Sequence, residues 1–279
     1  MQTFHDFARL LEIKRYAPNT INSYHGSLIA FQKYIGNKPI QELSTDKLLH
    51  EIGEVVLHKK LAYTTHKQLI GALKLYLMEI HNREIDFSTV YPKTQPRPLP
   101  VVLSLQEVKK VLDASTNLKH KCMLTMVYAL GLRSGELINL KITDIDKTRR
   151  QIHLKNAKGG KDRILPYPDS MRELLKAYYL EFKPQTYLFN GQNAPQYAPE
   201  SLRQVFIKAC VKARIKKTVT LHSLRHSYAT HLMDAGTDVR VIKELLGHNN
   251  IKTTLIYTHV TQRTLDKVPS PLDFLTALN

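Results

Sequence analysis

LLGHNNIKTTLIYTHV, the stretch from Leu245 to Val260, decides how the rest of this sequence is interpreted. His248 follows a glycine here, and Tyr257 comes nine residues later, between an isoleucine and a threonine. A tyrosine with an apolar neighbour in a helical pattern packs in a core in most proteins. The glycine and histidine ahead of it open a second interpretation, in which the Tyr257 hydroxyl is reactive.

The composition predicts a globular, cytoplasmic protein. Of the 279 residues 43% are hydrophobic, but no apolar run approaches the roughly 20 residues that a membrane helix needs. The N-terminus has neither the apolar region nor the cleavage site of a signal peptide. Cys122 and Cys210 lie in helical apolar patterns, so we expect two reduced core thiols. We therefore expect neither a membrane protein nor a disulfide scaffold.

The charge is strongly and unevenly positive. The formal net charge is +17, of which +4 falls in residues 1–100 and +13 in the remainder. Such an excess favours a polyanionic partner, and no separate basic amphipathic helix points to a membrane surface. Nucleic acid is the partner we expect. Charge alone leaves open a simpler alternative, a soluble protein with a high isoelectric point and no such partner.

Residues 1–91 have apolar side chains at helical spacing in four segments, which predicts a small four-helix domain. Ser44 or Thr45 is the expected N-cap of the third helix. Four prolines lie between residues 91 and 100, and proline cannot extend a helix. We therefore predict a stiff linker at residues 92–100 and a second domain at residues 101–279.

The second domain is predicted to be mainly α, with one small β-hairpin sheet. Ser104 and Glu107 have the spacing of a capping box, and an apolar helix is expected to end near Gly131. Two short alternating runs on either side of Gly159 and Gly160 predict the hairpin. Helical patterns then resume and continue toward the C-terminus.

Histidines in LHSLRHSYATHL raise the question of a metal site. His222 and Arg225 are three residues apart and share a helix face, while His226 is assigned elsewhere on the turn. His222 and His226 also have the four-residue spacing of a helical zinc pair. However, Ser223 replaces the glutamate of H-E-x-x-H, and no further ligand cluster accompanies the pair. No metal site is predicted.

Arg133 lies just beyond the predicted end of the apolar helix, with Glu136 one turn later. Taken alone, the two residues are compatible with an ordinary surface ion pair. Together with other elements they form a pattern of fixed order: Arg133 with Glu136, Lys158 beside the hairpin glycines, His222-x-x-Arg225, Gly247 with His248, and Tyr257.

This pattern resembles the tyrosine recombinase family, also called phage-type integrases, over residues 101–265. The opening stretch is especially similar to the Xer-type and integron-type branches. The resemblance implies a site-specific recombinase that cuts and rejoins DNA through a 3'-phosphotyrosyl intermediate. It further implies that residues 1–91 are a core-binding DNA-binding domain and residues 101–279 the catalytic domain with a C-terminal tail.

The chemistry of strand cleavage can be argued from the residue types. Breaking a phosphodiester needs an in-line nucleophile, neutralisation of the nonbridging oxygens and a proton for the leaving oxygen. Arg133 and Arg225 suit the neutralisation of the nonbridging oxygens, because a guanidinium can donate two parallel hydrogen bonds to a phosphate and a lysine cannot. A tyrosine has an ordinary pKa of about 10, so Tyr257 needs nearby cations or a base to attack at neutral pH.

The resemblance implies a role for each remaining residue. Tyr257 is the nucleophile, Lys158 protonates the departing 5' oxygen, and His222 assists proton transfer. His248 hydrogen-bonds the phosphate, and Glu136 orients its neighbours. No metal, nucleotide or other cofactor is required. Lys155, Lys161 and Arg163 compete with Lys158 for the lysine role, and the simpler interpretation of any of them is a solvated charge or a phosphate contact.

The expected partner is double-stranded DNA, bound by a monomer or dimer at each site and by a homotetramer on two sites. No membrane is involved, and we expect the protein in the cytoplasm with the nucleoid. The tail carries Leu272, Phe274, Leu275 and Leu278 and is too short to fold alone. It packs either on its own domain or, as the resemblance implies, on a neighbouring subunit.

Two other functions compete with this one. A catalytically silent DNA-binding protein of the same fold predicts that cluster residues are lost, and none is missing from the sequence. A type IB topoisomerase uses a similar cluster, but the separate helical N-terminal domain and the apolar tail favour a recombinase.

Overall fold

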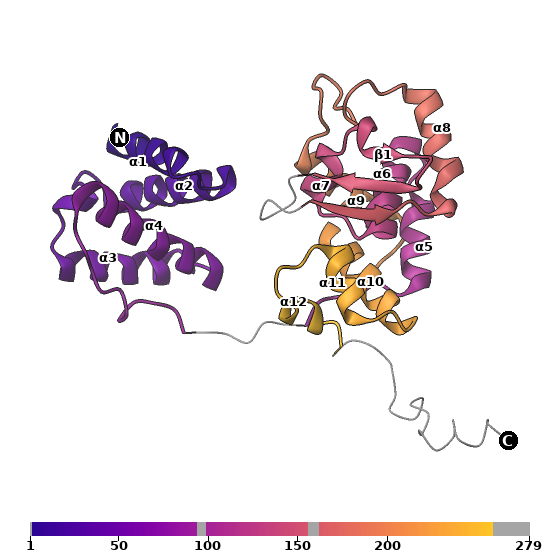
Figure 1. Cartoon of the computed structure of the whole chain (residues 1–279). Coiled ribbons are helices and arrows are strands. Elements are labelled where there is room, and N and C mark those ends of the chain that lie inside the picture. Colours follow the sequence, from indigo (N-terminus) through magenta and orange to yellow (C-terminus); the bar gives the residue numbers. More distant parts are fainter. Residues whose placement is uncertain (1, 94–98, 156–161, 259–279) are drawn as a thin grey trace, which may run out of the picture. The chain divides into compact units, whose positions relative to one another are not determined.

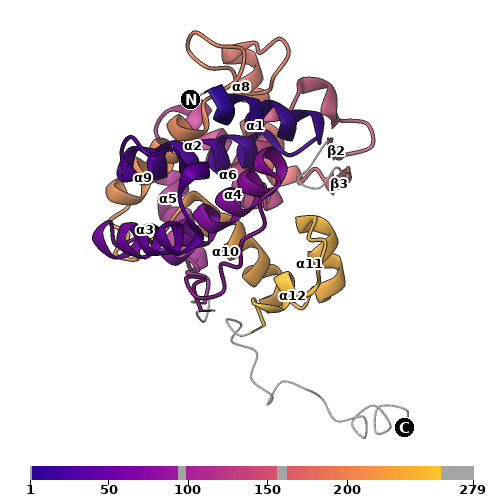
Figure 2. The same cartoon turned by 90° about the vertical axis from the view of Figure 1, so that its left-hand side faces the viewer.

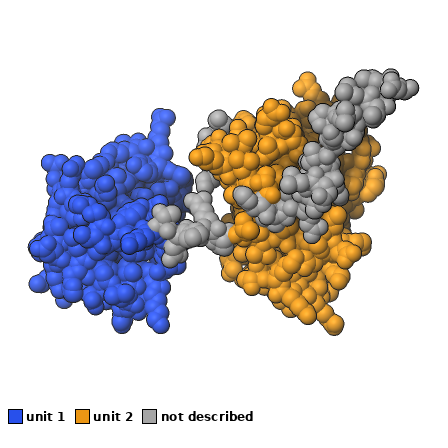
Figure 3. Space-filling view, turned by 90° about the horizontal axis from the view of Figure 1, so that it is seen from below, with its two compact units in different colours: residues 1–97 blue, residues 98–279 orange. Residues whose placement is uncertain are grey.

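The computed structural model describes residues 2–93, 99–155 and 162–258. The chain divides into two compact units, residues 1–97 and 98–279, shown in different colours in Figure 3. The division falls inside the proline-rich segment 92–100. None of the helices in the described ranges combines the length and the apolar character needed to cross a membrane.

The first unit is a bundle of helices, drawn in indigo to purple in Figure 1. Its elements are α1 (Gln2–Ile13), α2 (Pro18–Ile35), the 3-10 helix η1 (Ile40–Glu42), α3 (Thr45–His58) and α4 (Tyr63–His81). Tyr76 is fully buried at the centre, where the edges of Phe4 and Phe7 meet its ring. Of the two candidate N-caps of α3, Ser44 accepts the bond, from the Lys47 amide.

The second unit is mainly helical with a small sheet, which confirms the predicted fold class. Its first elements are α5 (Leu105–Ala114), α6 (Leu118–Leu130), α7 (Ser134–Asn139), η2 (Ile142–Asp144), β1 (Ile145–Asp146), β2 (Gln151–Leu154) and β3 (Arg163–Pro166). Then follow η3 (Asp169–Met171), α8 (Arg172–Phe182), α9 (Pro199–Lys212), α10 (Leu221–Asp234), α11 (Val239–Leu246) and α12 (Lys252–Leu255).

The sheet is antiparallel, in the order β1-β2-β3. The predicted hairpin corresponds to β2 and β3, in which Ile152 pairs with Leu165. β1 was not predicted, because a strand of two residues is too short to show alternation. The hairpin loop, residues 156–161, lies outside the described residues.

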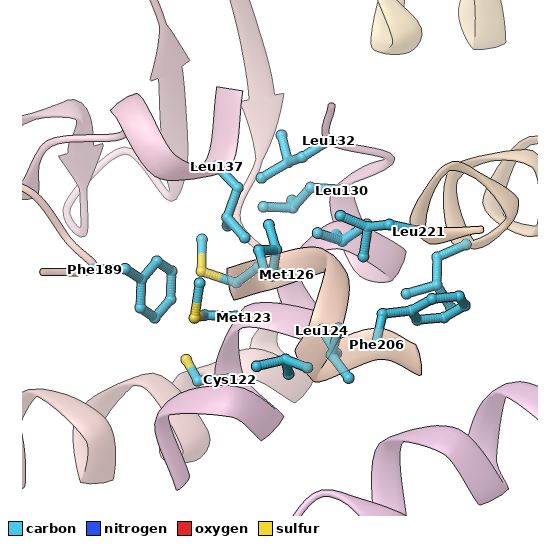
Figure 4. Packing of buried hydrophobic residues seen from close by; sticks show 14 of the residues in the cluster. Cys122, Met123, Leu124, Met126, Leu130, Leu132, Leu137, Phe189, Phe206 and Leu221 are labelled. Carbon is cyan, nitrogen blue, oxygen red and sulfur yellow. The ribbon is translucent and has the colours of Figure 1, made fainter. Parts of the chain in front are cut away.

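Helix α6 is the centre of this unit. Figure 4 shows its buried side chains, among them Met123 and Met126, packed between Phe189 on one side and Leu221 on the other. The predicted capping box at Ser104 and Glu107 is present on the neighbouring α5. Both cysteines are free and buried, and burial raises the pKa of the Cys122 thiol to about 12, which keeps it inert.

A second, smaller core belongs to the last three helices. In Figures 1 and 2, α10, α11 and α12 lie together at one end of the unit. Their buried residues form one cluster: Ala229, Met233, Ile242, Leu246 and Tyr257. α6 ends at Gly131, whose φ of +59° suits glycine, and a Cβ there would meet the Tyr228 ring at 2.5 Å. This close approach joins the two cores at the place where Arg133 follows.

Candidate active site

Arg133 is positioned by the turn between α6 and α7, where it is the N-cap residue of α7. Its backbone N–H donates to Glu136 Oε2 at 2.8 Å, and its Nη1 donates to Glu136 Oε1 at 2.6 Å. Its Nη2 donates to the Gly247 carbonyl at 3.3 Å. The Arg133 side chain is 22% exposed, so part of the guanidinium remains open to a ligand.

Glu136 is the centre of a cluster of arginines. Arg163 donates to both carboxylate oxygens of Glu136, from Nη1 to Oε1 and from Nη2 to Oε2, each at 2.8 Å. Arg225 Nη1 lies 3.8 Å from Oε2. Burial would raise the pKa of this carboxyl, but the hydrogen bonds and charge of Arg163 and the hydrogen bonds of Arg133 lower it to about 2. The side chain is only 8% exposed, so Glu136 is a buried anion and not half of a surface ion pair.

Arg225 lies on α10 and is completely buried, at 0% exposure. Its Nη1 donates to the carbonyl of Gly131 and its Nη2 to the carbonyl of Leu246, both at 2.5 Å. Among the described residues no acceptor contacts its Nε. Burial and the nearby charge of Arg133 lower its pKa to about 9, which still leaves the group charged at neutral pH.

His248 follows the left-handed Gly247 that ends α11. Its Nδ1 lies 2.9 Å from Thr254 Oγ1. Burial, then the charges of Arg225 and Arg133, lowers the pKa of His248 to about 3, so the imidazole is neutral at physiological pH. A neutral imidazole can donate a hydrogen bond without adding to the charge of the arginine cluster.

His222 is in the first turn of α10 and is exposed to solvent. The protein atoms packed around its ring, then Arg225 and Arg133, nevertheless lower its pKa. Its ring lies 4.5 Å from that of His226, so the assignment of His226 elsewhere on the turn was wrong; residues four apart share a helix face. Within the described ranges, no three His, Cys, Asp or Glu side chains gather as a metal site would require.

Tyr257 combines both interpretations of its sequence context, because the residue expected to react has its ring packed in the small core. It is 1% exposed and packs with Met233, Ile242 and Leu246. Its hydroxyl lies 3.0 Å from His226 Nδ1, the one hydrogen-bond partner it has in the described part of the chain. Burial raises the pKa of Tyr257, while the charges of Arg225 and Arg133 oppose that rise.

The structure brings most of the predicted residues into one site. Arg133, Glu136 and Arg225 lie in contact with one another, and the charges of Arg225 and Arg133 act on both His248 and His222. Lys158 lies outside the described residues. Two participants were missed, Arg163 and His226. The signal for His226 was its four-residue spacing from His222, and Arg163 had been considered only as a competitor of Lys158.

Comparison with known proteins identifies the family of this chain. The model of the phage integrase family matches residues 102–264. The chain belongs to this family.

Among relatives, tyrosine recombinase XerA of Pyrococcus horikoshii is 33% identical over 266 residues, covering 93% of this chain and 90% of the relative. Tyrosine recombinase XerD of Oceanobacillus iheyensis is 31% identical over 282 residues, covering 93% and 94%. The predicted tyrosine recombinase is therefore confirmed.

Solved structures agree with this assignment. A crystal structure of XerA recombinase is 28% identical, has a TM-score of 0.55, and the match covers 94% of this chain and 95% of that one. A lambda integrase dimer bound to a COC' core site has a TM-score of 0.75 at 17% identity, covering 96% of this chain and 79% of that one. At that identity the likeness establishes the fold alone.

Proposed function

We propose that this tyrosine recombinase cuts DNA with Tyr257 as nucleophile and rejoins the strands to new partners. The observation that carries the proposal is the arrangement of charge around one phenol. Arg133 and Arg225, 92 positions apart in the sequence, lie 2.6 and 3.8 Å from the same carboxylate, and both act electrostatically on Tyr257. Such a cluster stabilises the charge that develops on a phosphate during attack.

In the proposed first step, Tyr257 Oη attacks the phosphorus and the bond to the 5' oxygen breaks. The phosphate is then an ester of the 3' oxygen and the tyrosine. Arg133 offers the exposed part of its guanidinium to a nonbridging oxygen, and Arg225 has an Nε with no acceptor among the described residues. His248, as a neutral donor, supports the same phosphate.

The proton transfers are proposed from the resemblance. His222 assists in removing the proton of Tyr257, and Lys158 supplies one to the departing 5' oxygen. In the reverse step the 5' hydroxyl of another strand attacks the phosphotyrosine, so the bond energy is conserved. Because the Tyr257 ring is buried, attack also requires it to leave its place in the small core.

The first unit is proposed to grip the duplex as a core-binding domain. A groove of about 680 Å³ runs between α2 and α4. Its lining carries the donors and cations that read bases and phosphates: Asn19, Thr20, Ser23, Thr64, Lys67, Gln68 and Lys74. The logarithm of the DNA-binding constant should therefore fall steeply with the logarithm of the salt concentration, with a slope of about −0.9 for each phosphate contacted.

Assembly on DNA is proposed as a homotetramer that joins two sites, each occupied by a monomer or dimer before synapsis. A lambda integrase tetramer bound to a Holliday junction has the same fold at 16% identity. The tail lies outside the described residues, and its crossing to a neighbouring subunit stays a prediction. Deleting residues 270–279 is expected to leave single-site binding intact and to reduce synapsis and recombination together. We also propose a cytoplasmic, nucleoid-associated location.

Covalent trapping tests the proposed chemistry. On a site nicked near the cleavage position, attack releases a short fragment that carries the new 5' hydroxyl. Once this fragment has diffused away the strand cannot be rejoined, so the protein stays attached to the DNA. We expect an adduct that survives denaturant and forms equally well in excess chelator. An adduct that needs added magnesium, or that no tyrosine of the chain carries, would refute the mechanism.

A further inference from the structure

Arg163 joins three elements of the catalytic unit through one side chain. It is the first residue of β3, and its Nε donates to the Leu245 carbonyl in α11 at 2.9 Å. Its two other nitrogens grip Glu136 in α7, at 2.8 Å each. The contact with α11 is tight, because a Cβ on Gly247 would come within 2.9 Å of Arg163 Nη1. The side chain is 8% exposed.

These contacts distinguish Arg163 from the two arginines assigned to the phosphate. All three of its guanidinium nitrogens already donate to protein acceptors. Arg133 is 22% exposed, and in the part of the chain that the structure describes no acceptor bonds Arg225 Nε. Arg163 is therefore placed to hold the site together and not to bind substrate.

Arg163 binds Glu136, the carboxylate that competes with a phosphate for Arg133 and Arg225. Glu136 already bonds Arg133 through Nη1 and lies 3.8 Å from Arg225. A buried carboxylate with spare acceptor capacity draws any nearby guanidinium toward itself. By occupying both oxygens in a fork, Arg163 limits how far Glu136 can draw the other two arginines away from a phosphate.

We propose that Arg163 is a positioning residue for DNA cleavage. It saturates Glu136, so that Arg133 and Arg225 face the scissile phosphate. This inference rests on the proposed function, because it assigns the arginines to a phosphate. A lysine cannot replace Arg163, since an ammonium cannot fork onto both carboxylate oxygens while reaching the Leu245 carbonyl.

The first experiment compares two substrates in single-turnover cleavage of the nicked site. One carries an ordinary scissile phosphate and the other a methylphosphonate, whose methyl group replaces a charged nonbridging oxygen. We expect Arg163→Lys to bind DNA normally but to cleave the phosphate about 10²-fold more slowly, as when one transition-state donor is lost. On the methylphosphonate, the cleavage rate of Arg163→Lys divided by that of wild type should approach one. This substrate develops less negative charge in the transition state, so the placement of the arginines matters less.

A second measurement separates positioning from simple support of the fold. In a double-mutant cycle, Arg163→Met is compared in the native background and in Glu136→Gln. A neutral amide does not capture Arg133, so the cleavage defect of Arg163→Met should largely disappear in that background. A structural pin between β3 and α11 predicts the same defect in both backgrounds. This cycle decides the question even if the methylphosphonate is not cleaved.

Arg203→Met is the matched control. Arg203 also forks onto a glutamate, Glu200, but both lie exposed on α9. Its cleavage rate should stay within about twofold of wild type, because a surface substitution of this kind disturbs the fold little. If wild type and Arg203→Met form no adduct, the proposed function itself fails. If they form adducts and Arg163→Lys cleaves the phosphate at the wild-type rate, or is equally slow on both substrates, the positioning role is wrong.

Discussion

The arginine cluster around Glu136 and the pocket that holds Tyr257 lie in the same unit but are built by different physics. The cluster links α7 and β3 through charge-assisted bonds to a buried carboxylate, and Arg225 of α10 lies 3.8 Å from the same group. Tyr257 is held by apolar packing and by one bond to a neutral His226. Charge-assisted bonds are roughly twice as strong as neutral ones.

The difference indicates which part of the site moves. The cluster has its charges in place before a substrate arrives, which is what electrostatic stabilisation of a transition state needs. Tyr257 is 1% exposed and its hydroxyl is paired with His226, so we infer that the side chain leaves this position to attack. We therefore infer a rigid phosphate site and a nucleophile that is delivered to it. The predictions below test this contrast.

The largest effect is expected from Tyr257→Phe. Without the hydroxyl no phosphotyrosine forms, so the adduct on a nicked site should fall below detection. DNA binding should persist, because the arginines are unchanged. The free energy of unfolding should change by only about 1 kcal/mol, the net value of one neutral hydrogen bond. Denaturing gels, binding titrations and urea melts measure the three quantities; an adduct in Tyr257→Phe would show that another residue is the nucleophile.

Arg133→Lys and Arg225→Lys should both reduce cleavage by about 10²-fold or more, because a lysine loses the fork onto phosphate. Their effects on stability should differ. Arg225 is fully buried and bonds two backbone carbonyls, so its replacement leaves acceptors unpaired at a cost of about 1–3 kcal/mol. Arg133 is partly exposed and should matter less for folding. Equal destabilisation in thermal melts would contradict the burial contrast.

Acid should weaken the fold through the histidines of both regions. The pKa values of His226 and His248 are lowered to about 4 and about 3 in the folded protein, from an ordinary value of 6.5. Between these values the unfolded chain binds more protons than the folded one, so stability falls as the pH drops from about 6.5 toward 4.

The limiting slope is about 1.4 kcal/mol per pH unit for each histidine. Glu136, with a lowered pKa of about 2, adds its own loss only below about pH 4.5. Urea unfolding at several pH values measures the slope, and His226→Leu should reduce it. A flat profile between pH 4 and 6.5 would contradict the lowered pKa values.

Whether a feature of the fold or the site could be predicted depends on how far apart its residues lie along the sequence. Helices and the Ser104 capping box depend on neighbours within a turn, and periodicity found them. The main cluster was found through its order along the chain. Arg163 was missed because its partners lie 27 and 82 residues away, and the contact between His226 and Tyr257 was missed because they are 31 residues apart, although the spacing of His226 from His222 was a local signal. Contacts at such separations leave no spacing signal in a single sequence.

The smallest effect is expected from His226→Leu, which removes the bond to Tyr257 but keeps an apolar side chain of similar bulk. If Tyr257 must leave its pocket to attack, losing this bond lowers the cost of leaving. Adduct formation should then be faster, by no more than about tenfold, the factor that corresponds to 1.4 kcal/mol.

His226→Asn is the control, because its side-chain oxygen can accept from the hydroxyl near the position of Nδ1, and its rate should stay closer to wild type. Nitration of Tyr257, followed by mass spectrometry of its peptide, should increase in His226→Leu in the absence of DNA. If His226→Leu instead cleaves more slowly while binding DNA normally, His226 assists the attack and the delivery of the nucleophile is not limited by this bond.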